Sequence, residues 1–392
     1  MSGPLEGLRV LDLTRLLPGG YATLLMADLG ADVVKVEEPG KGDYIRWTPP
    51  MVGDFSAAHV SLNRNKRSLT LNLKKPEGRD LLLKLVEGFD VVIESFRPGV
   101  MDRLGVGYDA LKACNPELVY CAISGYGQDG PRSQTAGHDI NYIGYAGVLG
   151  INGEEGRRPV TPGVQIGDLA GGGMSAVIAI MAALYRRAAG GGGEFCDISM
   201  MDGAFSWLSI HAAEFVATGV APERERMHLS GAHPCYRVYP AADGWLSVGA
   251  LESHFWMALC DALERPDLKD DAFARGERRS EVIGELNELF SSRTRAEWME
   301  KLSHLDTCVG PVNDLGEAFE DPQLLHRDMV VEDELPDGAS WKHVGNPIRL
   351  RETPGQVKRL PPPGMGEHTD AILEEFGLAT EEIEGLHRAG VV

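Results

Sequence analysis

Closely spaced cysteines are missing from this sequence. Its six cysteines never form a CxxC pair and are scattered through apolar segments (Cys114, Cys121, Cys196, Cys235, Cys260 and Cys308). Zinc sites and disulfide frameworks use closely spaced cysteines. The distribution therefore argues against a metal site and favours reduced thiols in a cytoplasmic protein.

An excess of positive charge is missing as well. The 58 acidic residues outnumber the 38 basic ones and leave a formal net charge of −20. Such a surface repels nucleic acid and anionic membranes, so a phosphate-bearing ligand has to be met by a local basic cluster. No segment reaches the length of a membrane span without glycine or charge, and the start MSGPLEGLRV does not resemble a secretion signal. We expect no nucleic-acid partner and no membrane association.

The glycine fingerprint of dinucleotide-binding proteins is absent, although its structural context is present. LRVLDLT predicts a strand, PGGYATLLMADLGA a helix and DVVKVEEP a second strand, but PGGYA is not GxGxxG. Further expected strands, RSLTLNLK, DVVIESF, ELVYCAIS and EFCDISM, alternate with helical segments. This alternation predicts an α/β fold with a parallel, doubly wound sheet.

A chain of 392 residues with 43% hydrophobic content is long enough for two domains. We expect a large domain over residues 1–200, completed by 325–392, and a linker over 201–232. The linker begins with a long helix, MDGAFSWLSIHAAEFVATG, and its composition becomes charged and loop-like from Val220 to Ala232. A smaller α+β domain is expected over 233–324. It begins with YRVYPAADGWLSVGAL, which predicts a hairpin turning at Asp243 and Gly244.

A histidine and an aspartate stand 30 positions apart, each where an element is expected to begin. His138 follows a turn-rich run and opens HDINYIGYAGVLG. Asp168 precedes LAGGGMSAVIAIMAALYRR, an apolar run ending in two arginines, so we place it at the N-cap or in the first turn of a buried helix. Fixed amides there suit an enzyme that removes a proton beside a carbonyl. For each residue alone, a capping aspartate and a structural histidine are the commoner interpretations.

Eight motifs together give the chain a resemblance to a known family. They are VEEPGKGDYIR, NRNKRSLTLNLK, ESFRPGVMDRLG, SGYGQDGP, GHDINY, IGDLAGGG, ADGWLSVGALE and HTDAILEEFGL. Over nearly its whole length the chain resembles the family III coenzyme A transferases (the CaiB/BaiF superfamily), and GHDINY with GD and a later glutamate is similar to the α-methylacyl-CoA racemase branch. The resemblance implies a Rossmann-like large domain, a smaller domain and an interlocked homodimer.

The racemase resemblance also implies a reaction. Carried over by position, His138 and Asp168 correspond to the two acid/base residues, and Glu252 to a glutamate that orients the histidine, expected from the partner subunit. Epimerisation of a 2-methylacyl-CoA thioester removes the α-proton on one face and returns a proton on the other, which requires two opposed groups. An imidazole tuned by a carboxylate and a carboxyl group at a helix end meet this requirement.

The resemblance implies further contacts with coenzyme A, which is part of the acyl-CoA substrate, so no separate cofactor is expected. The positions carried over are Arg46, Arg97 and Arg103, then Leu71, Asn72, Leu73 and Lys74, and finally Gly137, Asp139, Ile140, Asn141 and Tyr142. A further basic cluster, Arg64, Lys66 and Arg67, either steers the ligand or is solvated on a loop.

Two alternatives stay open. The first is a coenzyme A transferase in which Asp168 is a nucleophile that forms an anhydride and then an enzyme thioester. Transferases of the family often carry a GGGGQ-type loop in the small domain, and the comparable segment here, LSGAHPCYRVY, has none. We therefore rank racemase first. The second alternative is a coenzyme A binding protein without catalysis, which any turnover would exclude.

Overall fold

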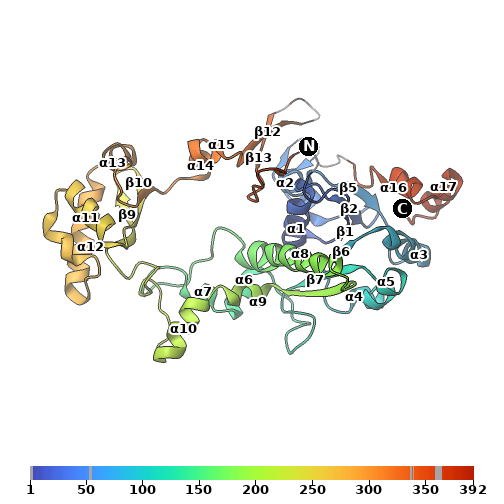
Figure 1. Ribbon diagram of the computed structural model, residues 1–392, viewed down its shortest axis with the longest axis horizontal. Helices are drawn as coiled ribbons and strands as arrows, with labels where there is room; N and C mark the ends of the chain where they lie inside the picture. The colour runs from blue at the N-terminus through green and yellow to red at the C-terminus, as the bar shows by residue number, and fades with distance from the viewer. Residues whose placement is uncertain (1–2, 53–54, 336–337, 339, 358–363) are drawn as a thin grey trace. The chain divides into compact units, whose positions relative to one another are not determined.

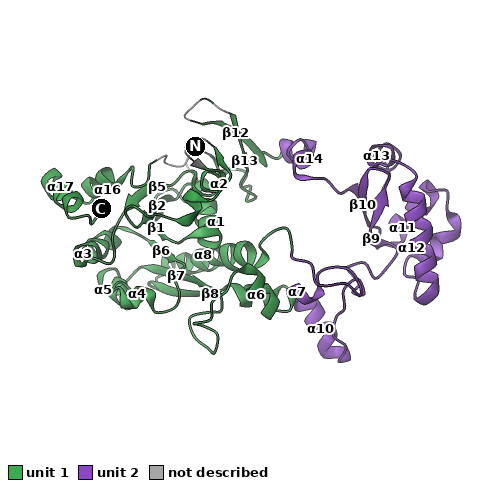
Figure 2. Ribbon diagram, turned by 180° about the vertical axis from the view of Figure 1, so that it is seen from behind, with its two compact units in different colours: residues 1–148, 162–207, 326–392 green, residues 149–161, 208–325 purple. Residues whose placement is uncertain are grey.

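The computed structural model describes residues 3–52, 55–335, 338, 340–357 and 364–392 (Figure 1). The chain forms two compact units (Figure 2). The first unit contains residues 1–148, 162–207 and 326–392, and the second contains residues 149–161 and 208–325. The second unit thus takes in a segment, 149–161, that the sequence analysis placed in the large domain.

A six-stranded parallel sheet is the framework of the first unit. Its strands are β1 (Arg9–Leu13), β2 (Asp32–Glu37), β5 (Arg67–Thr70), β6 (Val91–Glu94), β7 (Val119–Ser124) and β8 (Glu194–Ser199). They lie in the order β5-β2-β1-β6-β7-β8, so the direction of chain progression reverses between β1 and β6. Such a switch point opens a crevice at the carboxyl ends of the strands, where ligands of open α/β sheets bind. The predicted parallel sheet is confirmed.

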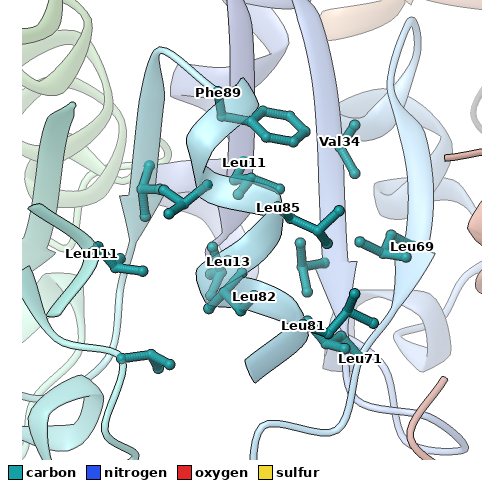
Figure 3. Packing of buried hydrophobic residues seen from close by; sticks show 14 of the residues in the cluster. Leu11, Leu13, Val34, Leu69, Leu71, Leu81, Leu82, Leu85, Phe89 and Leu111 are labelled. Atoms are coloured by element: carbon teal, nitrogen blue, oxygen red, sulfur yellow. The ribbon is translucent and has the colours of Figure 1, made fainter. Parts of the chain in front are cut away.

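Helices cover both faces of this sheet because its strands are apolar on both sides. On one face, Val10 and its neighbours pack against α1 (Leu16–Asp28) and α8 (Ser175–Ala188). On the other face, Leu11 packs in a cluster with residues of α3 (Pro76–Leu85) (Figure 3). That cluster also takes in residues of α5 (Tyr108–Cys114), α16 (Thr369–Glu375) and α17 (Thr380–Arg388). The C-terminal helices therefore belong to the core of the first unit.

The remaining elements outside the second unit are short. They are η1 (Tyr44–Trp47), β3 (Met51–Val52), β4 (Phe55–Ser56), α2 (Ala57–Asn63), η2 (Val86–Gly88), α4 (Val100–Arg103), α6 (Asp139–Tyr145), the π-helix η3 (Ile166–Met174), α9 (Met200–Ser206), β12 (Val330–Glu334) and β13 (Ser340–Val344). Among the described residues one helix, formed by η3 and α8 over Ile166–Ala188, is long and apolar enough to cross a membrane. Half of its most apolar window is buried, and buried core helices of soluble proteins pass the same test.

The second unit combines a small antiparallel sheet with helices. Its strands are β9 (Tyr236–Ala241), β10 (Gly244–Gly249) and β11 (Val309–Pro311), and its helices are α10 (Ser209–Thr218), α11 (Ser253–Ala262), η4 (Pro266–Asp271), α12 (Gly276–Ser291), α13 (Arg295–Leu302) and α14 (Leu315–Phe319), with α7 (Val148–Ile151) and α15 (Pro322–His326) at its boundaries. Gly244 pairs with Ala241, so the predicted hairpin is confirmed. Trp256, Phe290 and Trp298 fill a core separate from that of the first unit.

The segment expected as the linker 201–232, with one long helix at its start, is organised differently. The helix is broken into α9 and α10, and α9 lies in the first unit. A Cβ atom added to Gly203 of α9 would lie only 2.5 Å from the Cα atom of Gly171 in η3. Two glycines thus permit a backbone approach that the composition of the segment does not reveal.

The basic cluster Arg64, Lys66 and Arg67 is neither a steering patch nor a solvated loop. Lys66 is fully buried, with its Nζ atom 3.3 Å from Oδ2 of Asp12. Arg64 is 2% exposed and donates two hydrogen bonds to Asp28, of 3.0 and 2.7 Å. Both cations are paired with buried carboxylates, because a charge buried without a partner would be strongly unfavourable.

Removing one member of this buried set should therefore destabilise the first unit. We expect Lys66→Ala to lower the free energy of unfolding by about 3–5 kcal/mol, since Asp12 keeps its buried charge but loses a partner. The exposed pair of Arg388 and Glu384 offers a matched control, and Arg388→Ala should change stability by less than about 0.5 kcal/mol. Urea denaturation of the three proteins measures both values, and equal midpoints would contradict the expectation.

Candidate active site

Two hollows lie at the carboxyl ends of the parallel strands. The first, here called the Asp168 hollow, has a volume of about 200 Å³ and is lined by residues that follow β1, β6 and β7, among them Arg15, Arg97 and Tyr126, together with His138 and Asp168. The second, the strand-end hollow, has a volume of about 370 Å³ and is lined by residues that follow β1, β2, β5 and β6. Both flank the switch point between β1 and β6.

Asp168 lies in the first turn of a helix, as predicted, but the helix begins as a π-helix rather than an α-helix. The glycines that follow Asp168 explain the departure. A Cβ atom at Gly171 would lie 2.6 Å from the carbonyl oxygen of Met200, and one at Gly173 would lie 2.8 Å from that of Pro18. The π-helix therefore packs closely against the backbone of two other segments. Short π-helical turns are frequent at functional sites.

Burial governs the electrostatics of Asp168. Its backbone N–H donates a 2.9 Å hydrogen bond to Oδ1 of Asp139. Desolvation, followed by the nearby negative charge of Asp139, raises the pKa of the Asp168 carboxyl to about 7. At neutral pH the group therefore exists in both protonation states, as proton transfer or nucleophilic attack by a weakly solvated carboxylate would require.

His138 is the N-cap residue of α6 and its side chain is exposed. Its backbone N–H donates to Oδ1 of Asn141, which fixes the start of the helix. The prediction that His138 stands where a loop enters an element is confirmed. The imidazole lines the same hollow as Asp168, so the structure brings the two residues together.

Glu252 belongs to the second unit and is exposed at the N-cap position of α11. It is not among the described residues that line the Asp168 hollow. A role beside His138, supplied by a partner subunit, stays a prediction.

The residues expected to contact coenzyme A are divided. Leu71, Asn72, Leu73 and Lys74 line the strand-end hollow. Arg97, Gly137 and Tyr142 line the Asp168 hollow. Ile140 and Asn141 are exposed on α6, and Asp139, the first residue of that helix, is buried.

Two of the expected arginines lie elsewhere. Arg46 is 7% exposed and lines neither hollow, because its guanidinium donates two hydrogen bonds, of 2.7 and 2.6 Å, to the carboxylate of Glu37. A bidentate buried pair of this kind leaves the guanidinium little capacity for a phosphate. Arg103 is exposed on α4 and lines neither hollow.

Sequence reasoning missed Arg15, which lines both hollows. Its guanidinium lies 5.3 Å from the ring centroid of Phe96 and 5.7 Å from that of Tyr44. The available signal was its position two residues after β1, since ligands of parallel sheets bind where the strands end. None of the eight motifs that carry the family resemblance includes Arg15.

Comparison with known proteins identifies the class to which this fold and site belong. The sequence matches the CoA-transferase family III over residues 5–369. A CAIB/BAIF family protein from Brucella suis has a similar structure, with a TM-score of 0.84 at 34% identity, covering 96% of this chain and all of that one. The chain therefore belongs to the family III CoA-transferases, and the predicted family is confirmed.

Two curated human proteins are similar over almost the whole chain. Succinyl-CoA:glutarate CoA-transferase is 36% identical over 99% of this chain and 90% of its own length. Alpha-methylacyl-CoA racemase is 35% identical over 99% of this chain and 97% of its own length. The family thus includes both activities.

The raised pKa of Asp168 has a consequence for stability. The folded protein holds this proton more tightly than the unfolded chain, so stability falls as pH rises from about 4, the unfolded value, to about 7. Asp168→Asn should therefore be more stable than the wild type at pH 8, by about 2 kcal/mol after allowance for partial exposure, and equally stable near pH 4. Thermal unfolding at both pH values tests this, with exposed Asp80→Asn on α3 as the control. A variant that is less stable at pH 8 would contradict it.

Proposed function

We propose that the protein transfers coenzyme A between carboxylic acids and that the carboxylate of Asp168 is the nucleophile. The observation that carries the proposal is the placement of a half-buried carboxyl group, anchored through its backbone to Asp139, on the wall of a hollow at the switch point of a family III fold. Similarity to a succinyl-CoA:glutarate CoA-transferase supports transfer as the reaction.

Transfer requires Asp168 to be acylated and released in turn. An oxygen of the Asp168 carboxylate attacks the carbonyl carbon of the donor thioester, the C–S bond breaks, and the coenzyme A thiolate leaves a mixed anhydride. The thiolate then attacks the Asp168 carbonyl carbon, which forms an enzyme thioester and releases the donor acid. The acceptor carboxylate attacks this thioester, and the returning thiolate takes the acceptor acyl group from the second anhydride. Asp168 ends as a carboxylate, and no redox partner is needed.

The basic side chains at the site favour an acid with a second carboxylate. Arg15 and Arg97 both line the Asp168 hollow. Guanidinium groups bind carboxylates bidentately, so one of these arginines is suited to hold the far end of a short dicarboxylic acid. Succinate and glutarate are therefore the first acids to test.

Racemisation is the second candidate, and one observation favours it. The imidazole of His138 lines the same hollow as Asp168, as two opposed acid/base groups would. The sequence analysis ranked this activity first because His138 was present and the GGGGQ-type loop was not. The similarity to the racemase does not exceed that to the transferase, so the earlier ranking is not supported.

The transferase proposal predicts turnover of succinyl-CoA with glutarate, without added metal or nicotinamide, to glutaryl-CoA and succinate. Asp168→Ala should lower the rate by about 10³-fold or more, since the nucleophile is lost, whereas His138→Ala should retain activity within about tenfold. Hydroxylamine added during turnover should leave a hydroxamate on the peptide that contains Asp168, detected by mass spectrometry.

The contrary outcome is equally specific. If recovered 2-methylacyl-CoA gains α-deuterium in deuterated water, His138→Ala and Asp168→Ala both abolish that exchange, and no hydroxamate forms, the protein is a racemase. Asp197→Asn is the control for both assays, because Asp197 accepts a 3.1 Å hydrogen bond from the Gln128 N–H but lines neither hollow.

We also propose that the active form is a homodimer. Apolar side chains remain exposed along α8 and α10, with Ile178 68%, Tyr185 80%, Ile210 70% and Val216 82% exposed. Side chains of this size on two long helices are suited to be covered by a second copy. Light scattering should return twice the chain mass of 42.5 kDa, and Tyr185→Glu with Val216→Glu should shift the protein toward the monomer. A monomeric wild type with full activity would contradict the proposal.

A further inference from the structure

We propose that Asp139 is a positioning residue that acts through Asp168: its buried carboxylate anchors the backbone of the nucleophile and keeps a second negative charge beside it. This inference rests on the proposed function and assigns Asp139 a part in it. The resemblance had placed Asp139 among the contacts of coenzyme A, together with the rest of the GHDINY motif.

The geometry separates Asp139 from its neighbours in that motif. Asp139 is the first residue of α6 and is 8% exposed, whereas His138, Ile140 and Asn141 are exposed. Its Oδ1 atom accepts the backbone N–H of Asp168 at 2.9 Å, across 29 residues of chain. The carboxylate thus faces the helix that carries the nucleophile and is not among the described residues that line the Asp168 hollow.

Glycine at position 167 makes this contact possible. A Cβ atom added there would lie 3.0 Å from Oδ1 of Asp139 and 3.4 Å from a methyl group of Ile143. Any larger residue would press the carboxylate and α6 away from the π-helix. The glycine before Asp168, part of the IGDLAGGG motif, therefore leaves room for the Asp139 carboxylate beside the Asp168 backbone.

The charged and titratable groups around Asp168 come from four other segments. Arg15 and Arg97 follow β1 and β6, Tyr126 follows β7, and His138 and Tyr142 belong to α6 with Asp139. Asp139 differs from all of them in being an anion in hydrogen-bond contact with the Asp168 backbone. Both burial and this anion raise the pKa of Asp168.

A fixed negative neighbour has a direct effect on the transfer cycle. Asp168 attacks the donor as an anion and is neutral as an anhydride or a thioester. Repulsion from Asp139 destabilises the anion and is relieved on acylation, so it favours the covalent intermediates over the resting state. The hydrogen bond to the Asp168 N–H meanwhile holds the nucleophile in place as its charge changes.

Substitution can separate the anchor from the charge. Asp139→Asn keeps an oxygen that can accept the Asp168 N–H but removes the charge. Asp139→Glu keeps the charge, and Asp139→Ala removes both. Asp197→Asn is the matched control, because it removes one carboxylate that accepts a backbone N–H on the same unit and lies outside the hollow.

The first readout needs no turnover. In protein labelled with ¹³C at the aspartate carboxyl groups, the signal missing from Asp168→Asn identifies Asp168, and its midpoint in the wild type is expected near pH 7. Asp139→Asn should lower this titration midpoint by about one pH unit, and Asp139→Glu and Asp197→Asn should leave it near the wild-type value.

The second readout is the fraction of enzyme trapped as a hydroxamate at saturating succinyl-CoA, which should fall about tenfold in Asp139→Asn. Asp139→Ala should additionally lower kcat, because the nucleophile loses its anchor.

An unchanged midpoint in a folded Asp139→Asn protein overturns the inference, whatever the effect on activity. If Asp139→Asn does not fold, a midpoint that also stays raised in Asp139→Ser overturns it. If the titration midpoint of Asp168 shifts in Asp139→Asn but the protein transfers no coenzyme A, the role of Asp139 beside Asp168 is retained and the proposed function is rejected. If the protein transfers coenzyme A but the titration midpoint of Asp168 is unchanged in Asp139→Asn, the proposed function is retained and the role of Asp139 is rejected.

Discussion

The close approach of glycine backbones around Asp168 is the constraint on which the site depends. Gly171 and Gly173 lie against the carbonyl oxygens of Met200 and Pro18, and Gly167 leaves room for the carboxylate of Asp139. Because no side chain intervenes, the π-helix is held against the residues that follow β1 and β8. The carboxyl group of Asp168 is thereby placed on a half-buried helix at the switch point of the sheet rather than on a loop.

Basic residues are fewer than acidic ones in this chain, and the structure places them in two kinds of environment. Arg46, Arg64 and Lys66 are buried in ion pairs with Glu37, Asp28 and Asp12, so their charges are neutralised inside the first unit. Arg15 and Arg97 line the hollow and remain available to an anionic ligand. Two guanidinium groups at the ends of the strands thus give this acidic protein a local positive charge at the hollow.

The sequence was sufficient to predict the alternation of strands and helices in the first unit and the hairpin at Asp243. It was also sufficient to predict the start of α6 at His138 and the helix at Asp168. Each depends on local chemistry: apolar periodicity, turn residues and capping positions that act within a few residues. The burial of Arg46 and Lys66 could not be predicted, because a basic residue in a motif looks the same whether its partner is a phosphate or a carboxylate brought in by the fold. The choice between transferase and racemase was ranked in the opposite order to the one that the comparisons support.

The sequence by itself determined the α/β class, the parallel sheet, the family and the placement of His138 and Asp168 at helix starts, since these follow from periodicity and from motifs that are short and contiguous. Tertiary structure decided the π-helical start of the Asp168 segment, the break between α9 and α10, and the pairing of Asp139 with the Asp168 backbone across 29 residues. The reason is physical. How closely two backbones approach, and which charges lose their water, depends on residues far apart in the chain that only folding brings into contact.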